Sequence, residues 1–224
     1  LFGRAEVAGE HGQVGEPERP IKPAGSNARI WVALGLLVLA AVPVFGSSFS
    51  QVLITDIIIF CLFAASLHFM LGLGGMVSFG HAAYFGGGAY VAALLVSYAN
   101  TPMELALILA PIGAGMLAFL IGWFCIRLTG VYFAMLTLAF AQLLWSLVFQ
   151  WGEVTGGDDG MVDLWPSAWL NSTSAYYYLT LVLGVGSIIL LRPFAHSSFG
   201  YALRASRDSS RQAEATGINT QRMK

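Results

Sequence analysis

The chain has 224 residues, of which 57% are hydrophobic and only 10% are charged, and its mean hydropathy is +0.71. Soluble domains carry about 25% charged residues, so this composition excludes a soluble globular protein and predicts an all-α, polytopic membrane protein. The formal net charge of −1 does not identify partners, because the charges are segregated along the chain. Cys61 and Cys125 both fall inside apolar runs, which argues against a disulfide framework and a metal site. We expect no cofactor and no nucleic-acid partner.

Residues 1–28 are polar and lack apolar periodicity, so they are predicted to be a disordered tail without the hydrophobic region of a signal peptide. Six apolar runs follow, each near the ~20 residues that cross ~30 Å of hydrocarbon. The runs are 29–46, 52–71, 76–98, 103–126, 130–150 and 175–191. The last run is short, but Tyr176 and Arg192 near its ends are typical interface anchors. These features predict a transmembrane bundle over 29–193.

The basic residues indicate an orientation. If the amino terminus is cytoplasmic and six spans alternate, all 11 basic residues fall on the inner side. They are Arg4, Arg19, Lys22, Arg29, Arg127, Arg192, Arg204, Arg207, Arg211, Arg222 and Lys224. The acidic residues Glu104, Glu153, Asp158, Asp159 and Asp163 then lie outside. The positive-inside rule therefore predicts a cytoplasmic tail and a cytoplasmic segment over 194–224.

Residues 71–96 carry an unusual number of glycines for an apolar run. Gly72, Gly74 and Gly75 come close together, and the polar Ser78 and His81 follow. One interpretation is a helix broken at membrane depth, which is tolerated where it is covered by protein or lines a translocation path. The other is a tight turn between two helices, followed by a helix with a small-residue packing face. Under the first interpretation Gly74, Gly75, Ser78 and His81 are candidate substrate-path residues.

The run 130–150 contains the polar residues Thr137, Gln142 and Ser146. Such groups usually form hydrogen bonds to a neighbouring helix, and a substrate contact is the alternative. We include Thr137 and Gln142 among the candidate path residues. Small residues recur every fourth position at Ala114, Ala118 and Gly122, and at Gly88 and Ala92, a pattern that lets helices approach closely.

The connection after residue 150 contains TGGDDG at residues 155–160. Asp158, Asp159 and Asp163 lack the alternating ligand spacing of a calcium loop, so a solvated turn is predicted. The chain also lacks the phosphate-binding pattern GxxxxGK[ST] and is not expected to hydrolyse ATP by that device.

The segment 198–224 is the second informative stretch. Arg204, Arg207 and Arg211 recur at spacings of three and four, which places them on one face of a helix. Gly217 is suited to end that helix as a left-handed cap. A basic helix of this kind can lie on anionic lipid or face a soluble partner. Its alanine-rich apolar face is weak for lipid insertion, which favours the partner. Asp208 and Glu214 lie among the arginines.

Four separated runs resemble one known family. They are residues 72–95, GVYFAMLTLAFAQ at 130–142, TGGDDG at 155–160 and FGYALRASRDSSRQAEATGIN at 199–219. In this order they resemble the branched-chain amino acid ABC transporter permeases of bacterial plasma membranes. The resemblance implies a second permease subunit, two ATP-binding subunits and an extracytoplasmic substrate-binding protein. It also implies that residues 204–217 form the helix that docks into an ATP-binding subunit. Arg204, Arg207, Asp208, Arg211, Glu214 and Gly217 are then the candidate coupling residues.

The resemblance implies import by alternating access, driven by ATP hydrolysis on separate subunits. Members of the family continue through further spans after this loop, so the chain is expected to be a fragment with an incomplete bundle. Close relatives of this family carry urea or short amides, so a permease for urea or short-chain amides is the alternative that the resemblance implies. From a different class, an ion-coupled secondary transporter would use His81 as a proton relay, because an ionisable residue within the membrane is often functional. A passive channel would need rings of charge or of carbonyls, which the sequence does not display.

Overall fold

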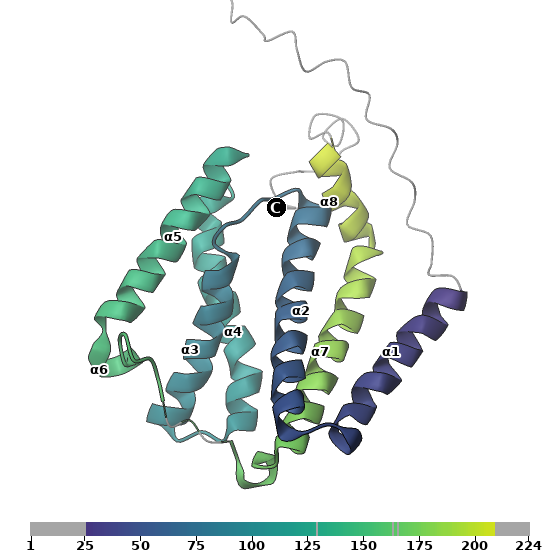
Figure 1. Cartoon of the computed structure of the whole chain (residues 1–224). Coiled ribbons are helices and arrows are strands. Elements are labelled where there is room, and N and C mark those ends of the chain that lie inside the picture. Colours follow the sequence, from purple (N-terminus) through teal and green to yellow (C-terminus); the bar gives the residue numbers. More distant parts are fainter. Residues whose placement is uncertain (1–25, 129, 163, 165, 209–224) are drawn as a thin grey trace, which may run out of the picture. The chain divides into compact units, whose positions relative to one another are not determined.

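The computed structural model describes residues 26–208 except 129, 163 and 165 (Figure 1). All regular elements in this described part are helical, as the composition predicts. The α-helices are α1 (Ser26–Phe45), α2 (Ser48–Gly74), α3 (His81–Ala99), α4 (Met103–Cys125), α5 (Val131–Gln150), α6 (Gly152–Thr155), α7 (Thr173–Ala195) and α8 (Ser198–Asp208). A 3-10 helix, η1, covers Ala168–Leu170. The boundary between two compact units lies inside α1, between Ala41 and Val42.

Five of the described helices, α2, α3, α4, α5 and α7, are long and apolar enough to cross a membrane by length and composition. The chain is therefore a polytopic helical membrane protein. The first predicted span, 29–46, corresponds to the shorter apolar stretch Arg29–Phe45 of α1. The count of six spans stays a prediction.

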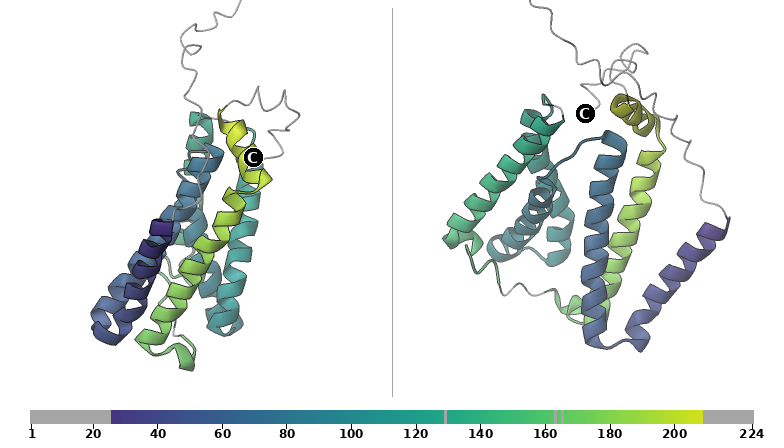
Figure 2. Two further views of the ribbon diagram at one scale, coloured as in Figure 1. Left: turned by 90° about the vertical axis from the view of Figure 1, so that its right-hand side faces the viewer. Right: turned by 45° about the horizontal axis from the view of Figure 1, so that its top comes forward.

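From residue 42 onward the helices form two groups (Figures 1 and 2). The first, which we call the α2 group, consists of α2, α7, α8 and η1. The second, the α3 group, consists of α3, α4, α5 and α6. Among the described residues, every helix pair with extended contact lies inside one group. Residues 75–80, called here the linker, join the groups at the α8 end, and the connection from α6 to η1 joins them at the opposite end (Figure 1).

The helix boundaries follow from local chemistry. The hydroxyl of Ser47 accepts a hydrogen bond from the Ser50 amide and caps the start of α2. Gly75, with φ of 61°, ends the same helix in the left-handed conformation, and its amide donates to the carbonyl oxygen of Leu71. Gly130, also with φ of 61°, precedes α5. Glycine tolerates this backbone region, so the glycines terminate helices rather than interrupt them.

The expected run 76–98 is wrong at its start, because residues 76–80 are not helical and α3 begins at His81. Hydrophobicity could not detect this, since Met76, Val77 and Phe79 are as apolar as the helix that follows. The expected run 175–191 was too short. The helix α7 continues to Ala195 and includes Arg192 and Pro193.

The small-residue pattern brings α3 and α4 together. A Cβ atom at Gly88 would lie 3.4 Å from the Cβ atom of Ala114. At Gly87 it would lie 2.7 Å from Leu117, and at Gly113 it would lie 2.7 Å from Val91. Close approach of helix backbones is a main source of helix association in lipid. These contacts therefore hold the α3 group together.

Candidate functional site

The linker touches both groups and contains or borders most of the candidate path residues. Its last residue, Gly80, lies against the backbone of α5. A Cβ atom at Gly80 would lie 2.5 Å from the carbonyl oxygen of Thr137 and 3.2 Å from its Cβ atom. Only glycine fits at this distance without moving α5. Thr137 and the linker are therefore neighbours, although 57 positions separate Gly80 from Thr137 in sequence (137 − 80).

His81, the first residue of α3, contacts α2. Its Nε2 atom lies 2.8 Å from the Ser66 hydroxyl oxygen, and its ring centroid is 5.2 Å from that of Phe63. The Ser66 hydroxyl donates to the carbonyl oxygen of Phe63 at 2.8 Å. A serine hydroxyl has one proton, and with that proton donated to Phe63 we assign His81 Nε2 as the donor to Ser66. The neutral ring then has an unprotonated Nδ1 atom.

Two buried polar atoms near the start of α3 lack a hydrogen-bond partner among the described residues. They are the Ser78 hydroxyl oxygen and His81 Nδ1. The Ser78 side chain is only 6% exposed. An unsatisfied buried polar group costs about 1–3 kcal/mol. These two atoms are therefore the polar groups at this site that water or a ligand would satisfy.

Thr137 and Ser146 form hydrogen bonds within α5, not to a neighbouring helix. The buried Thr137 hydroxyl donates to the carbonyl oxygen of Ala134 at 2.8 Å. Ser146 accepts from Gln150 Nε2 at 2.8 Å. The expected bond to another helix is thus wrong for Thr137, because a threonine in a helix can reach a carbonyl of its own preceding turn.

A cavity of about 610 Å³ lies between α3 and α5. The α3 side supplies small residues and Tyr90, the α5 side supplies Gln142 and aromatic rings, and the turn after α6 supplies acidic residues. The lining is Phe79, Ala82, Ala83, Gly86, Gly87, Tyr90, Leu117, Leu138, Ala141, Gln142, Leu144, Trp145, Val148, Phe149, Gly157, Asp158, Asp159 and Gly160. Of the candidate path residues, Gln142 lines this cavity. Of the others, Gly74 ends α2, Gly75 and Ser78 lie in the linker, His81 begins α3, and Thr137 lies in the first half of α5.

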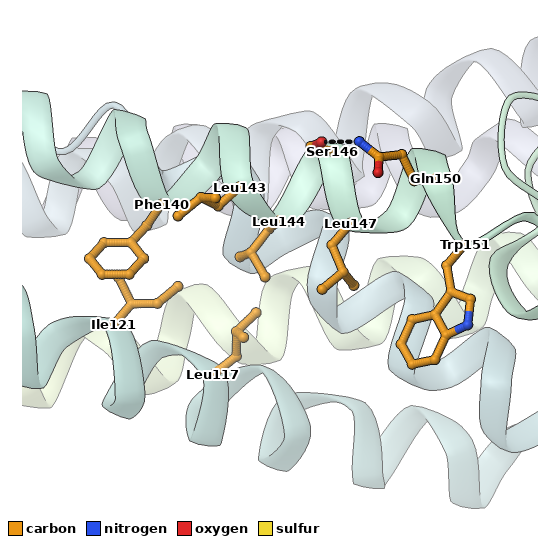
Figure 3. Close-up of a pocket in the computed structure, with 9 residues that line it drawn as sticks. All are labelled: Leu117, Ile121, Phe140, Leu143, Leu144, Ser146, Leu147, Gln150 and Trp151. Carbon is orange, nitrogen blue, oxygen red and sulfur yellow. Dashed lines mark hydrogen bonds between the residues drawn. The ribbon is translucent and has the colours of Figure 1, made fainter.

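A second cavity, of about 590 Å³, lies between α4 and α5. Figure 3 shows Leu144, Leu147 and Trp151 of α5 pointing toward Leu117 and Ile121 of α4. Its polar side chains, Ser146 and Gln150, form a hydrogen bond with each other (Figure 3). This cavity thus offers little polar chemistry with which to orient a substrate.

The TGGDDG segment forms a turn that is held by hydrogen bonds. The Thr155 hydroxyl, on a side chain 4% exposed, has the carbonyl oxygens of both Val148 and Trp151 within hydrogen-bond distance and shares its one proton between them. Gly156, Gly157 and Gly160 all have positive φ. The predicted turn is confirmed at residues 155–160, where Asp158 and Asp159 are exposed, whereas Asp163 lies outside the described residues.

The helix α8 carries the first candidate coupling residues, Arg204, Arg207 and Asp208. It packs on α2 and α7, with Leu203 only 6% exposed. The Arg207 guanidinium donates to the carbonyl oxygen of Gly72 at the end of α2. Arg211, Glu214 and Gly217 lie outside the described residues.

Several residues of this region were missed by the sequence reasoning. They are Phe63, Ser66, Gly80 and Leu203. Leu203 is the one large aliphatic residue among the arginines of 198–211, and this alone marks the buried side of α8. Ser66 and Phe63 gave no such signal, because a serine and a phenylalanine in an apolar run are ordinary.

Comparison with known proteins identifies the family. Residues 50–224 match the model described as the branched-chain amino acid transport system/permease component. The high-affinity branched-chain amino acid transport system permease proteins LivM of Salmonella typhimurium and Escherichia coli are each 32% identical over 132 residues. That region covers 58% of this chain and 31% of each relative, so the match spans about a third of their length. No solved structure matches. The chain belongs to the family of branched-chain amino acid transport system permease components.

Proposed function

We propose that this chain is a membrane subunit of an ATP-driven importer of branched-chain amino acids in a bacterial plasma membrane. The observation that carries the proposal is the family match over residues 50–224. The two LivM relatives, whose names state branched-chain amino acid transport, support the substrate class. The five apolar helices support a membrane location.

The partners are a second homologous permease, two ATP-binding subunits and an extracytoplasmic substrate-binding protein. The surrounding lipid is the remaining partner. In this proposal ATP is hydrolysed on the ATP-binding subunits, and the segment from α8 to Gly217 docks into one of them. The packing of α8 against α2 and α7 supports a mechanical link between such a subunit and the bundle.

Transport in this proposal occurs by alternating access. The α2 and α3 groups are the parts that move relative to each other, since extended helix contacts lie within each group. The linker, which contains Gly75 and Ser78, lies beside the path together with the neighbouring Gly74, His81 and Thr137. Gln142 faces the cavity between α3 and α5. The unpartnered Ser78 hydroxyl and His81 Nδ1 support this placement, because a passing polar substrate can bond to them.

The decisive experiment is co-expression with the cognate subunits, purification in detergent and reconstitution into proteoliposomes. We expect the ATP-binding subunits to co-purify, and the loaded binding protein to stimulate ATP hydrolysis and uptake of labelled leucine, isoleucine or valine. Uptake of urea or a short amide in their place would reassign the substrate. Uptake driven by a proton gradient without ATP would instead support a secondary transporter that uses His81.

Orientation is tested separately by cysteine labelling in intact cells. In a background lacking the two native cysteines, Ser172→Cys should react with an impermeant thiol reagent. Gln13→Cys and Ser209→Cys should react only after the membrane is opened, because both ends are proposed to be cytoplasmic. Labelling of Ser209→Cys from outside would contradict the proposed topology.

A further inference from the structure

The carboxyl end of α2 is covered by α8. The Arg207 guanidinium donates to the carbonyl oxygen of Gly72, and Leu203 is buried at the same place. A Cβ atom at Gly74 would lie 3.8 Å from Leu203 Cδ2. At Gly75 it would collide with the aliphatic part of the Arg207 side chain. Residues 72–75 thus form a seat for α8, and at Gly75 the seat requires the absence of a side chain.

The Arg207 contact has a clear physical basis. The last four carbonyl groups of a helix have no partner inside the helix. In α2 the Gly75 amide satisfies Leu71, and Arg207 satisfies Gly72. A cation near a helix carboxyl end is also stabilised by the helix dipole, and a charge-assisted hydrogen bond is stronger than a neutral one. Arg207 therefore attaches α8 to α2 by an interaction that neither helix makes alone.

Arg207 attaches α8 to α2 at the point where α2 passes into the linker. At Gly75 the chain leaves α2 and enters the linker, whose other end is fixed to α5 by the Gly80–Thr137 approach and to α2 by the His81–Ser66 hydrogen bond. A displacement of α8 that carries the end of α2 with it thus acts directly on the linker, and through it on the α3 group.

We propose that Arg207 is a positioning residue that makes α8 and the last turn of α2 move as one body, so that movement of α8 reaches the linker. Gly74 and Gly75 are then the seat of α8 and not substrate contacts. Arg207 accordingly faces its own chain, in contrast to a direct contact with an ATP-binding subunit. This inference rests on the proposed function only for its transport readout.

The first test needs no transport activity. In a background of Cys61→Ala and Cys125→Ala, the pair Gly74→Cys and Leu203→Cys reports the contact of α2 with α8 through the rate of cross-linking by a short bifunctional thiol reagent in membranes. We expect Arg207→Gln to slow cross-linking about threefold or more, since the charge-assisted hydrogen bond that joins the two helices is lost. Arg192→Gln, at an exposed arginine of α7, is the matched control and should not change the rate. An unchanged rate in Arg207→Gln would overturn the inference.

The second test uses the reconstituted complex. Arg207→Gln should keep substrate-stimulated ATP hydrolysis but transport about fivefold less substrate per ATP hydrolysed. A factor of about five is the lower end of the coupling factors that are typical between two sites of a protein. Cross-linking of the cysteine pair in the Arg207→Gln protein should restore the ratio, because the covalent bridge replaces the hydrogen bond. Arg207→Lys should fall between the two, since it keeps a charged donor.

The outcomes separate the inference from the proposed function. Loss of stimulated ATP hydrolysis in Arg207→Gln, without rescue by the cross-link, would mean that Arg207 contacts the ATP-binding subunit and would overturn the inference. A parental complex that neither hydrolyses ATP nor transports would refute the proposed function, while the cross-linking rates would still decide the role of Arg207.

Discussion

The α2 group and the α3 group both combine hydrogen bonds with close packing at glycine, but at different helix pairs. Gly184 of α7 lies close to Ile58 of α2 in the first group, and the Tyr98 hydroxyl of α3 donates to the Glu153 carbonyl of α6 in the second. In the α2 group, polar side chains join helices: Ser174 of α7 donates to Gln51 of α2 at 3.1 Å, and Arg207 of α8 donates to Gly72. In the α3 group, glycines let α3 and α4 approach closely. Lipid gives no hydrophobic drive for helices to associate, so close packing and hydrogen bonds are the two sources of affinity.

Buried side chains occur in both groups, with Tyr177 in the α2 group and Thr137 and Cys125 in the α3 group. The two described cavities, however, are lined largely by α3, α4 and α5. The packing of the α3 group therefore borders the cavities, whereas the contacts of α8 with α2 lie at the linker. Four predictions test these contacts, from the largest expected effect to the smallest.

The largest effect is expected at Gly80, where the linker meets α5. Gly80→Val places a branched side chain against the Thr137 backbone, 2.5 Å from the first added carbon. Overpacking of this kind costs about 1–3 kcal/mol or more, and it should also separate the two groups. We expect a lower free energy of unfolding in mixed micelles and loss of transport. The matched control is Gly86→Ala, since nothing lies within 4 Å of a Cβ atom there. Equal stability of the two variants would contradict a required close approach at Gly80.

The next largest effect is expected where α3 packs against α4. A side chain at Gly113 would meet Val91 at 2.7 Å, whereas Gly115 has open space. Gly113→Leu should therefore lower the free energy of unfolding by about 1–3 kcal/mol, and Gly115→Leu should leave it nearly unchanged. Thermal unfolding in detergent measures both. If the two leucines destabilise equally, small residues do not determine how α3 and α4 pack.

A smaller effect is expected for the polar bond of the α2 group. Gln51→Leu and Ser174→Ala each remove one side of the hydrogen bond between α2 and α7. Hydrogen bonds between membrane helices contribute about 0.6 kcal/mol on average. A double-mutant cycle on the free energy of unfolding should give a coupling energy near that size. A coupling energy of zero would show that the Gln51–Ser174 hydrogen bond does not stabilise the packing of α2 against α7.

The smallest effect is expected for His81→Gln. Glutamine can donate a hydrogen bond to Ser66 as His81 Nε2 does, so the α2–α3 contact should survive. We expect most of the transport activity to remain, with an unchanged dependence on pH. His81→Leu, which cannot donate, should lose more. Loss of the pH dependence of transport in His81→Gln alone would support proton coupling through this residue.

The sequence by itself determined the class of protein and most of the helices. Low charge and long apolar runs exclude a soluble fold because soluble domains carry about 25% charged residues. They predict helices because backbone groups in lipid must be satisfied within the segment. The four family motifs led to the family that the comparisons confirm. The turn at residues 155–160 was also predictable, since its glycines and aspartates favour turns. The start of α3 was not, because residues 76–80 are apolar and apolar residues occur both in spans and in linkers.

Only the tertiary structure decided which candidate residues meet. The glycines before residue 76 signalled an unusual backbone, but the sequence could not distinguish a substrate path from a seat for another helix. That distinction depends on the approach of α8, because Arg207 contacts Gly72 although 135 positions separate them in sequence. The same holds for Gly80 beside Thr137 and for His81 beside Ser66. Hydrophobic periodicity reports which segments enter the membrane, whereas helix partners in lipid are chosen by close packing and single polar bonds, which leave little trace in composition.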